Sequence, residues 1–594
     1  MQEIRERIQK LREAMKEEGI DCYLVFSSDP HQSEYLDEHY KTRAYLSGFT
    51  GSAGYMAITS ERAILWTDGR YHVQAERQLE GSGIELFKLG LPDTQTLPQF
   101  LETYLEKGMC AACDGTTISR KEYTEFLDSI RPAGFRTDVD LFEQIWDDRP
   151  NVTHKPIYEL PLSVCGQMRS EKIADLRTKL KQMDADSCLI SDLSSVMWLF
   201  NIRGKDVSCN PVAFSYAYVS RNEAILFAEP SAVSDVLREA LRIDGITCLP
   251  YEEILSFLTN LWDMRIALDP ITCNCRNYAA LFTRNKMAEF NEYELIPKHV
   301  KNETEIAMAK KYHEADAVSM IRFIKYIKSA CKTEKITEYR AAQYVDGLRA
   351  GTEGFTDLSF ETICAYGPNG AIIHYAPEKE NSLVIEPKGF LLLDSGGQYM
   401  GATTDVTRTI ALGPLTDEEK THYTAVLKAV IALAGVRFMK GTTGLHLDIL
   451  ARSPIWELGI DYRHGTGHGI GAFLNVHEGP QNFRFKMSND SEPVEIVPGM
   501  ITSDEPGIYI ENSHGIRIEN EILCVDDAEN EWGTFYRFET LTLVPLEKEA
   551  IVLSMLTEKE KQWINAYHKM VYERISPYLE VAEKEWLKQA TDPI

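Results

Sequence analysis

The chain has 594 residues, of which 63 are lysine or arginine and 90 are aspartate or glutamate, so its formal net charge is −27. This acidic balance argues against nucleic acid as a partner, because lysine and arginine supply the contacts to a phosphate backbone. Residues 1–18 are too charged for a secretory signal, no apolar run is long enough to span a membrane, and the 12 cysteines are scattered as in reduced cytosolic proteins. We therefore expect a cytoplasmic protein of several domains with no membrane partner.

The N-terminal part, residues 1–155, has the pattern of an α/β domain. Apolar residues recur at helical spacing over residues 4–15, and the apolar run at residues 22–26 is typical of a buried strand. Residues 45–54 are rich in glycine and hydroxyl side chains, which favour tight turns. We predict a first α/β domain over this part of the chain.

The next part, residues 156–297, repeats the first in degenerate form, at an offset of about 165 residues. Residues 176–190 match residues 11–25, and AILF at 224–227 corresponds to AILW at 63–66. A repeat of this size indicates a duplicated domain rather than a solenoid. Because the second copy lacks the glycine-rich stretch of the first, we expect it to serve structure and dimerisation rather than chemistry.

A third domain is predicted over residues 298–594. Amphipathic patterns predict helices at residues 306–328 and 338–349. A strand is predicted at residues 373–375, and apolar residues at helical spacing predict a C-terminal helical extension over about 546–594.

Two aspartates lie on neighbouring predicted strands. Asp394 follows the apolar run at 390–393 and precedes a glycine turn, and Asp405 lies within the stretch at 403–410, whose β-branched residues predict a second strand. A hairpin would bring the two carboxylates together, and a buried unpaired carboxylate costs several kcal/mol unless it meets a cation. The alternative is that Asp394 caps a turn and that Asp405 pairs with Arg408.

Two glutamates follow in similar positions. Glu505 precedes Pro506-Gly507, which fixes a bend and stiffens the backbone that carries the carboxylate. Glu519 lies in GIRIENEI at 515–522, where alternation places the isoleucines on one face and Arg517, Glu519 and Glu521 on the other. Taken alone, Glu505 is typical of a turn and Glu519 of a solvent-exposed strand position.

Histidines and glycines are concentrated between these carboxylates. His464 and His468 lie four residues apart in HGTGHG, which has too many glycines for a helix and matches neither a zinc-protease helix nor a phosphate loop. Such glycines indicate backbone that approaches a ligand closely. His477 follows in NVHEGP, so three histidines could face one site.

These segments together resemble the catalytic domain of the pita-bread metallopeptidases, and specifically the long, three-domain aminopeptidase P (Xaa-Pro aminopeptidase) family. The resemblance extends to both ends of the chain. It implies a multidomain α+β and α/β fold, with two tandem creatinase-like α/β domains followed by a pita-bread catalytic domain. The matching segments are GPNGAIIHYAP (367–377), LLLDSGGQY (391–399), TTDVTRT (403–409), HGTGHGIG (464–471), NVHEGP (475–480), SDEPG (503–507) and GIRIEN (515–520).

The resemblance implies an enzyme that releases the N-terminal residue from peptides with proline in the second position, by means of a hydroxide that bridges two divalent metal ions. It implies that Asp394 holds one ion and that His468 and Glu505 hold the other. Asp405 and Glu519 would bridge both. Oxygen ligands with one nitrogen and no thiolate suit Mn²⁺, with Co²⁺, Fe²⁺ or Zn²⁺ as alternatives.

The resemblance also implies roles for the residues around the ions. Glu505 would take the proton of the attacking water and pass it to the leaving nitrogen, and His374 would stabilise the oxyanion. His464 and His477 would position the substrate. Arg517 would orient the carboxylate two residues further along the same strand.

In this family the N-terminal domain lies over the mouth of the active site, usually that of a dimer partner. We therefore expect a homodimer. The fixed positive charge of Arg70, in an Asp-Gly-Arg turn of the first domain, would meet a carboxylate of the peptide substrate.

Other functions share parts of this pattern. A prolidase uses the same ligands on Xaa-Pro dipeptides, but the three-domain length favours the aminopeptidase. A pita-bread protein that has lost its metals would only bind peptides or partner proteins. A metal-free relative that hydrolyses creatine is a further alternative. The presence of all five ligand types argues against these metal-free alternatives.

Overall fold

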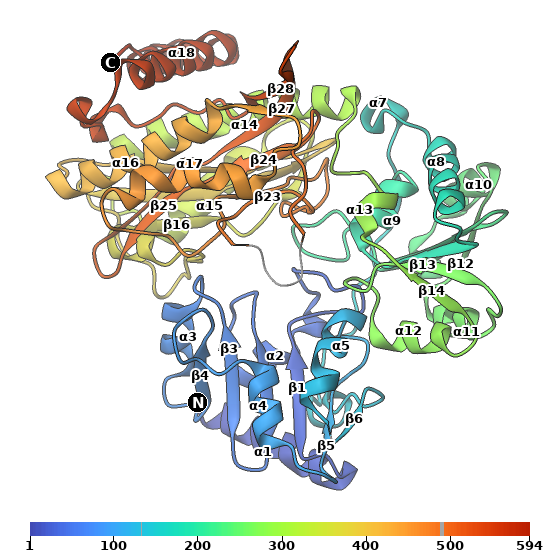
Figure 1. Ribbon diagram of the computed structural model, residues 1–594. Helices are drawn as coiled ribbons and strands as arrows, with labels where there is room; N and C mark the ends of the chain where they lie inside the picture. The colour runs from blue at the N-terminus through green and yellow to red at the C-terminus, as the bar shows by residue number, and fades with distance from the viewer. Residues whose placement is uncertain (132, 487–491) are drawn as a thin grey trace. The chain divides into compact units, whose positions relative to one another are not determined.

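The computed structural model describes residues 1–131, 133–486 and 492–594 (Figure 1). The chain forms two compact units. The first comprises Met1–Leu162 and Gln167–Pro297, and the second comprises Ser163–Gly166 and Lys298–Ile594. Within the described ranges, every helix is too short or too polar to cross a bilayer.

The first unit contains two six-stranded sheets with the same strand order. In each, a central strand pairs antiparallel with one neighbour and parallel with the other, so the duplication predicted from the sequence is confirmed. The first sheet is β4 (Glu85–Lys88), β3 (Ala63–Thr67), β2 (Tyr55–Thr59), β1 (Cys22–Phe26), β5 (Cys110–Ala112) and β6 (Gly134–Arg136). The second is β12 (Ile246–Pro250), β11 (Ala224–Ala228), β10 (Ser215–Ser220), β8 (Ser187–Ile190), β13 (Arg265–Leu268) and β14 (Lys286–Glu289).

The second unit packs helices on several short sheets around one apolar core. The two predicted helices are confirmed as α14 (Glu303–Ala330) and α15 (Glu338–Ala350). The start of α14 is fixed by Asn302, whose side chain accepts from the N–H groups of Thr304 and Glu305. Helices α16 (Asp417–Ala434) and α17 (Gly444–Trp456) pack side by side, as Figure 1 shows.

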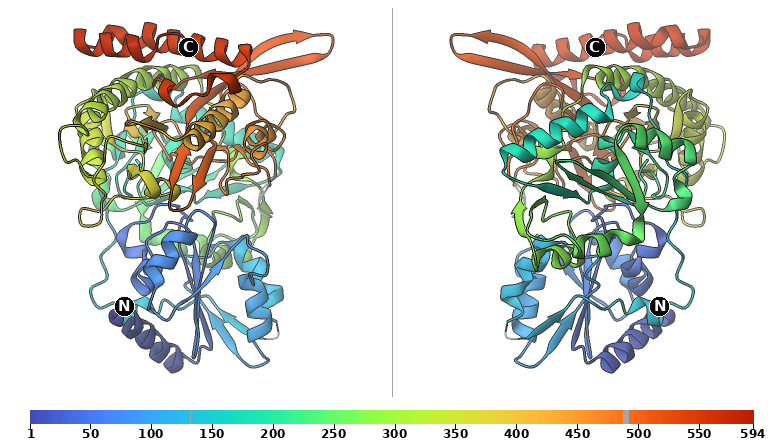
Figure 2. Two further views of the ribbon diagram at one scale, coloured as in Figure 1. Left: turned by 90° about the vertical axis from the view of Figure 1, so that its left-hand side faces the viewer. Right: turned by 90° about the vertical axis from the view of Figure 1, so that its right-hand side faces the viewer.

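The strands of this unit bring distant parts of the sequence together. The sheets are β16 (Ile363–Tyr366), β17 (Phe390–Ser395) and β20 (Val406–Ala411); β15 (Phe355–Leu358), β18 (Gly397–Tyr399) and β19 (Ala402–Thr403); β21 (Arg437–Met439), β28 (Gly533–Thr540), β27 (Asn520–Asn530) and β24 (Ile501–Asp504); and the pair β25 (Gly507–Ile510) and β26 (His514–Arg517). The hairpin of β27 and β28 projects from the rest of the unit in both views of Figure 2.

Of two further expectations for this unit, the structure corrects the strand at residues 373–375 and confirms the C-terminal helices. The strand predicted at residues 373–375 is wrong: the 3-10 helix η4 (Gly367–Ala371) leads into a turn, closed by the bond from the Tyr375 N–H to the Ile372 carbonyl at 3.1 Å. Gly367 at φ 56° and the following proline start η4, and residues 372–375 form the turn after it. The return to helix after about residue 546 is confirmed by α18 (Glu558–Ile575) and α19 (Val581–Ala590).

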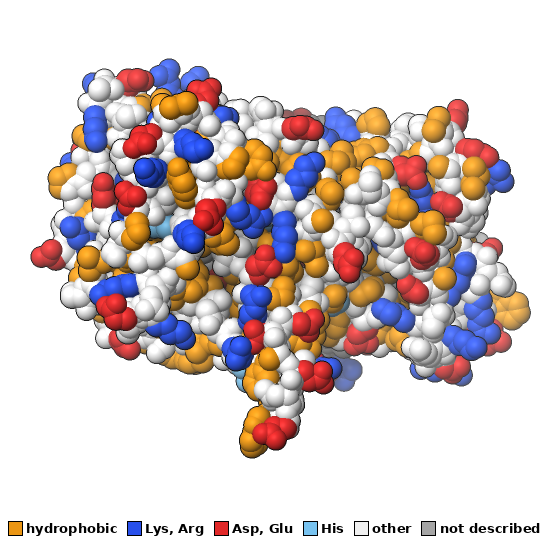
Figure 3. All heavy atoms as spheres, turned by 90° about the horizontal axis from the view of Figure 1, so that it is seen from above, with side chains coloured by type: hydrophobic (Ala, Val, Ile, Leu, Met, Phe, Trp, Pro, Cys, Tyr) orange, Lys and Arg blue, Asp and Glu red, His pale blue; other side chains and the backbone are white. Residues whose placement is uncertain are grey.

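The surface carries its charge in mixed form. On the face seen in Figure 3, acidic and basic side chains lie interspersed, with hydrophobic side chains between them. The excess of acidic residues is therefore not gathered into one field on this face.

A close backbone contact joins β26 to η4. A Cβ built on Gly515 would lie 1.7 Å from the carbonyl oxygen of Gly370. Only glycine allows this approach, which positions the hairpin of β25 and β26 against η4.

Substitution of Gly515 by alanine must push these two segments apart. We expect Gly515→Ala to lower the free energy of unfolding by about 1–3 kcal/mol, the usual cost of overpacking, in urea titrations followed by circular dichroism. Gly347→Ala is the matched control, because Gly347 lies inside α15 with no atom within 4 Å of an added Cβ. It should raise stability by about 1 kcal/mol through helix propensity. Equal stability of the two variants would contradict the close contact.

Candidate metal centre

The five predicted ligand residues all lie at or beside strand ends of the second unit. Main-chain bonds between segments distant in sequence bring these ends together. Asp394 in β17 pairs with Thr407 in β20, and the Glu519 N–H donates to the Thr407 carbonyl at 3.1 Å. The Glu505 N–H donates to the Thr466 carbonyl at 2.8 Å, next to the short strand β22 (Gly467–His468).

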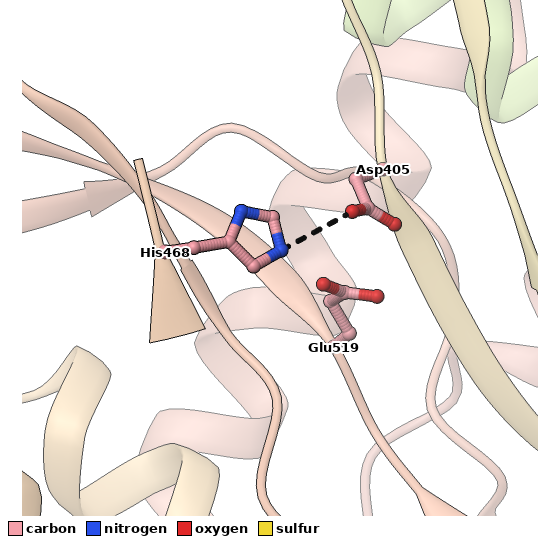
Figure 4. Close-up of side chains that lie close together, drawn as sticks. All are labelled: Asp405, His468 and Glu519. Atoms are coloured by element: carbon pink, nitrogen blue, oxygen red, sulfur yellow. Dashed lines mark ion pairs between the residues drawn. The ribbon is translucent and has the colours of Figure 1, made fainter. Parts of the chain in front are cut away.

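Three of these residues form one compact group. Ligand atoms of Asp405, His468 and Glu519 lie within 4.8 Å of one another (Figure 4). His468 Nε2 lies 3.6 Å from Asp405 Oδ2 and 3.5 Å from Glu505 Oε1. Because His468 Nδ1 donates to the Gly469 carbonyl at 3.0 Å, the lone pair of the neutral ring is on Nε2 and points to the carboxylates.

The carboxylates of this group repel one another. Burial raises the pKa values of Asp405 and Glu505 well above their usual range, and the charge of Glu519 adds to both shifts. Burial and the charge of Asp394 raise the pKa of Glu519 to about 8. The charge of Arg517 offsets this repulsion only in part, so the site has more negative charge than its surroundings balance.

The donor set fits divalent metal ions. Among the residues that the structure describes, Asp394 Oδ1 and Asp405 Oδ1 are buried and have no hydrogen-bond partner. Buried oxygen atoms of this kind, with the Nε2 of His468, match the preferences of hard and borderline cations.

Arg517 has a different direct partner from the one we expected. Its Nη2 donates to Asp394 Oδ2 at 2.6 Å rather than to Glu519. Arg517 reaches Glu519 through Thr407, since Nε donates to the Thr407 hydroxyl at 3.2 Å and this hydroxyl donates to Glu519 Oε2 at 2.8 Å. Residues 515–519 alternate as predicted, but both faces are buried, so the solvent-exposed alternative for Glu519 is wrong.

The alternative pairing of Asp405 with Arg408 is also wrong. The Arg408 guanidinium lies on the other side of β20 and donates to the Glu519 carbonyl at 2.7 Å and to Asn520 Oδ1 at 2.8 Å. Arg408 thus stabilises the backbone that carries Glu519 and leaves the Asp405 carboxylate to the metal centre.

Two candidate catalytic histidines, His464 and His477, lie beside the predicted ligand residues. The His477 ring packs edge-on against His468 with centroids 4.3 Å apart. His464 Nδ1 lies 4.0 Å from Glu505 Oε2, and His464 Nε2 bonds to the Tyr509 hydroxyl at 2.9 Å.

His374 lies in the turn after η4 instead of a strand. The carbonyl of the preceding Ile373 accepts from Arg517 Nη2 at 3.5 Å, which is the link between this turn and Asp394.

Arg70 belongs to the first unit. Its Nε and Nη2 donate to the two carboxylate oxygens of Asp68 at 3.0 and 2.8 Å. The carboxylate that meets Arg70 here is therefore its own neighbour in the turn, and contact with a substrate stays a prediction.

Sequence reasoning missed Tyr509, Thr407 and Glu521. The Tyr509 hydroxyl joins His464 to Arg517, whose Nη1 donates to it at 2.8 Å. The alternation of β25 around the buried Ile508 was a signal that Tyr509 points to the site.

The raised pKa values predict how pH affects the metal-free protein. Glu519 titrates near 4.5 when unfolded and at about 8 when folded, so between these values the folded state binds more protons. The stability that this group contributes is present below pH 4.5 and is lost as pH rises toward 8.

The thermal midpoint of EDTA-treated protein should therefore fall by several °C from pH 5 to pH 8, relative to protein saturated with Mn²⁺. Each 1 kcal/mol moves the midpoint of a domain of 150–250 residues by about 2–4 °C. Scanning calorimetry of both forms measures the difference. Parallel pH profiles with and without Mn²⁺ would refute the expectation.

Family profiles match four stretches of the chain. Residues 307–526 match "Metallopeptidase family M24", residues 7–142 and 148–305 match "Creatinase/Prolidase N-terminal domain", and residues 534–594 match "C-terminal region of peptidase_M24".

Individual relatives match over nearly the whole chain. "Probable Xaa-Pro aminopeptidase P" of Tuber melanosporum is 38% identical and covers 99% of both chains. "Aminopeptidase P2" of Arabidopsis thaliana is 37% identical over 99% of this chain and 88% of its own length. The crystal structure of a Caenorhabditis elegans X-prolyl aminopeptidase, described as "a cytosolic enzyme with a di-nuclear active site", superposes with a TM-score of 0.94 at 32% identity over 99% of both chains. The chain thus belongs to the aminopeptidase P family of M24 metallopeptidases, with two creatinase-type domains before a pita-bread domain.

Proposed function

We propose that this protein is a dinuclear-metal aminopeptidase that releases the N-terminal residue from peptides with proline in the second position. The observation that carries the proposal is the buried group of Asp405, His468 and Glu519, with Asp394 and Glu505 beside it, in a chain similar to named Xaa-Pro aminopeptidases along its full length. This length favours the aminopeptidase over an Xaa-Pro dipeptidase with the same ligands.

The proposed ligand assignment follows the predicted roles. Asp394 would hold one ion, His468 and Glu505 the other, and Asp405 and Glu519 both. Divalent ions bound there would lower the pKa of a shared water toward neutrality and polarise the substrate carbonyl. We propose Mn²⁺, because the set has one nitrogen and no thiolate.

The protein's own side chains would move protons and orient the peptide. Burial raises the pKa of Glu505, which suits a group that takes a proton from water and passes it to the leaving nitrogen. His464 lies 4.0 Å from Glu505 and His477 packs on His468, so both would align the substrate beside these carboxylates. His374 would donate to the developing oxyanion.

The remaining expectations are also proposals. We propose domains at residues 1–155, 156–297 and 298–594, the last with a helical extension from about residue 546; the compact unit that ends at Pro297 supports the second boundary. A cytoplasmic location is supported by the free state of all the cysteines, which lie within the described ranges. The homodimer, and the contact of Arg70 with substrate, rest on the family alone.

The substrate is tested with metal-stripped protein refilled with Mn²⁺. We expect cleavage of an Xaa-Pro-Xaa tripeptide after its first residue, little cleavage of an Xaa-Pro dipeptide, and loss of activity on chelation, all followed by chromatography of the products. His468→Ala, which removes the single nitrogen ligand, should abolish turnover, whereas His446→Ala on the exposed start of α17 should not.

Preferential cleavage of the dipeptide would make the protein a prolidase. Binding of Mn²⁺ without cleavage of either peptide would leave only a peptide-binding role.

A further inference from the structure

A buried pair of charged residues lies directly behind the metal centre. Glu521 in β27 is fully buried, and its Oε1 accepts from the backbone N–H of Asp405 at 2.7 Å. Its other oxygen, Oε2, lies 3.1 Å from Nε2 of His313 in α14. His313 is buried as well. The carboxylate of Glu521 thus connects His313 of α14 to the backbone N–H of Asp405, a proposed bridging ligand.

The His313 ring is held from both sides. Nδ1 lies 2.7 Å from the carbonyl oxygen of Ala309, one turn earlier in α14. A carbonyl can only accept, so Nδ1 carries a proton, and Nε2 faces a carboxylate. Burial alone would lower the pKa of His313, but the contact with the Glu521 carboxylate, the Ala309 carbonyl and the charge of Asp316 together outweigh it, and the pKa is raised. The His313 ring therefore faces the Glu521 carboxylate through Nε2, at ion-pair distance.

Glu521 is anchored at its backbone too. Its N–H donates to the Thr542 hydroxyl at 2.8 Å, and its carbonyl accepts from the Leu541 N–H at 2.8 Å. The same strand begins directly after Glu519. A movement of Glu521 would consequently disturb both carboxylates proposed to bridge the ions.

The backbone N–H of Asp405 needs an acceptor such as the Glu521 carboxylate, because Asp405 stands between two strands. β19 ends at Thr403 and β20 begins at Val406, so the Asp405 N–H lies outside either strand's ladder. A buried N–H without an acceptor is costly, and a carboxylate is a strong acceptor.

We propose that His313 and Glu521 are positioning residues of the metal centre, which fix the main chain of Asp405 so that its carboxylate can hold both ions. The inference rests on the proposed function. Partners behind metal ligands typically contribute 10–100-fold to metal affinity. His313 touches neither substrate nor ion in this account and acts only through Glu521.

A second contact of α14 points the same way. Asp316, one turn after His313, pairs with Arg349 at 2.7 Å, and Arg349 Nη2 donates to the carbonyl of Ser395 at 3.2 Å. Ser395 follows Asp394 directly. The helix therefore supports the backbone at both aspartates of the site.

Two substitutions at His313 separate its two contacts. In His313→Gln the amide nitrogen takes the place of Nε2 and still faces Glu521. In His313→Asn it takes the place of Nδ1, so the contact with Ala309 is kept and the contact with Glu521 is lost. Isothermal titration of the metal-stripped full-length variants with MnCl₂ gives the affinity of each site.

We expect His313→Gln to bind Mn²⁺ within about threefold of the unsubstituted protein, and His313→Asn to bind at least one ion about 10–100-fold more weakly. Glu521→Gln is a second test, because it keeps an acceptor for Asp405 but removes the charge that His313 faces. It should weaken Mn²⁺ binding to a similar extent.

Ile327→Ala is the matched control, since Ile327 is buried in α14 and belongs to the apolar core rather than to this contact. It should lower the thermal midpoint without changing Mn²⁺ affinity. If His313→Asn and Glu521→Gln bind Mn²⁺ as tightly as the unsubstituted protein, the positioning role is refuted while the proposed function stands. If the unsubstituted protein binds no Mn²⁺, both fail.

Discussion

The mutual repulsion of the buried carboxylates is the constraint on which the second unit depends. Asp394, Asp405, Glu505 and Glu519 are brought together by strand ends, and Arg517 offsets part of their charge through Asp394. Without further positive charge Asp405, Glu505 and Glu519 bind protons more tightly than exposed carboxylates do, as their raised pKa values show. On the proposed function, two divalent ions replace those protons. Metal affinity and the stability of the fold then both depend on pH, because ions and protons compete for the same carboxylates.

The backbone holds this unfavourable group in place. Bonds between Glu519 and Thr407, and between Glu505 and Thr466, join strands that are far apart in the sequence. Close contacts at glycine, as between Gly515 and Gly370, let the hairpin of β25 and β26 pack against η4. Contacts from α14 then hold the backbone beside the two aspartates, through Arg349 at Ser395 and through Glu521 at Asp405. The rigidity that the carboxylates require therefore comes from main-chain bonds and buried ion pairs rather than from the carboxylates themselves.

The sequence predicted more of the fold than of the contacts within the site. Apolar runs before Asp394, the duplicated α/β pattern and the long helix α14 follow from local periodicity, which the structure confirms. The strand predicted around His374 was wrong because Gly367 and its neighbouring proline start the 3-10 helix η4, which leads into a turn that apolar periodicity does not reveal. The partner of Arg517 and the roles of Thr407 and Glu521 could not be predicted, since they depend on which side chains face each other between strands and helices distant in sequence.

The most direct test of this account is anomalous diffraction from crystals of the protein soaked in MnCl₂, measured near the manganese absorption edge. The account predicts two anomalous peaks per chain, with Asp405 and Glu519 contacting both and His468 contacting one. Asp394 should contact the other ion. A single peak, peaks away from these residues, or no peak at manganese concentrations that saturate the protein in solution would contradict the central claim.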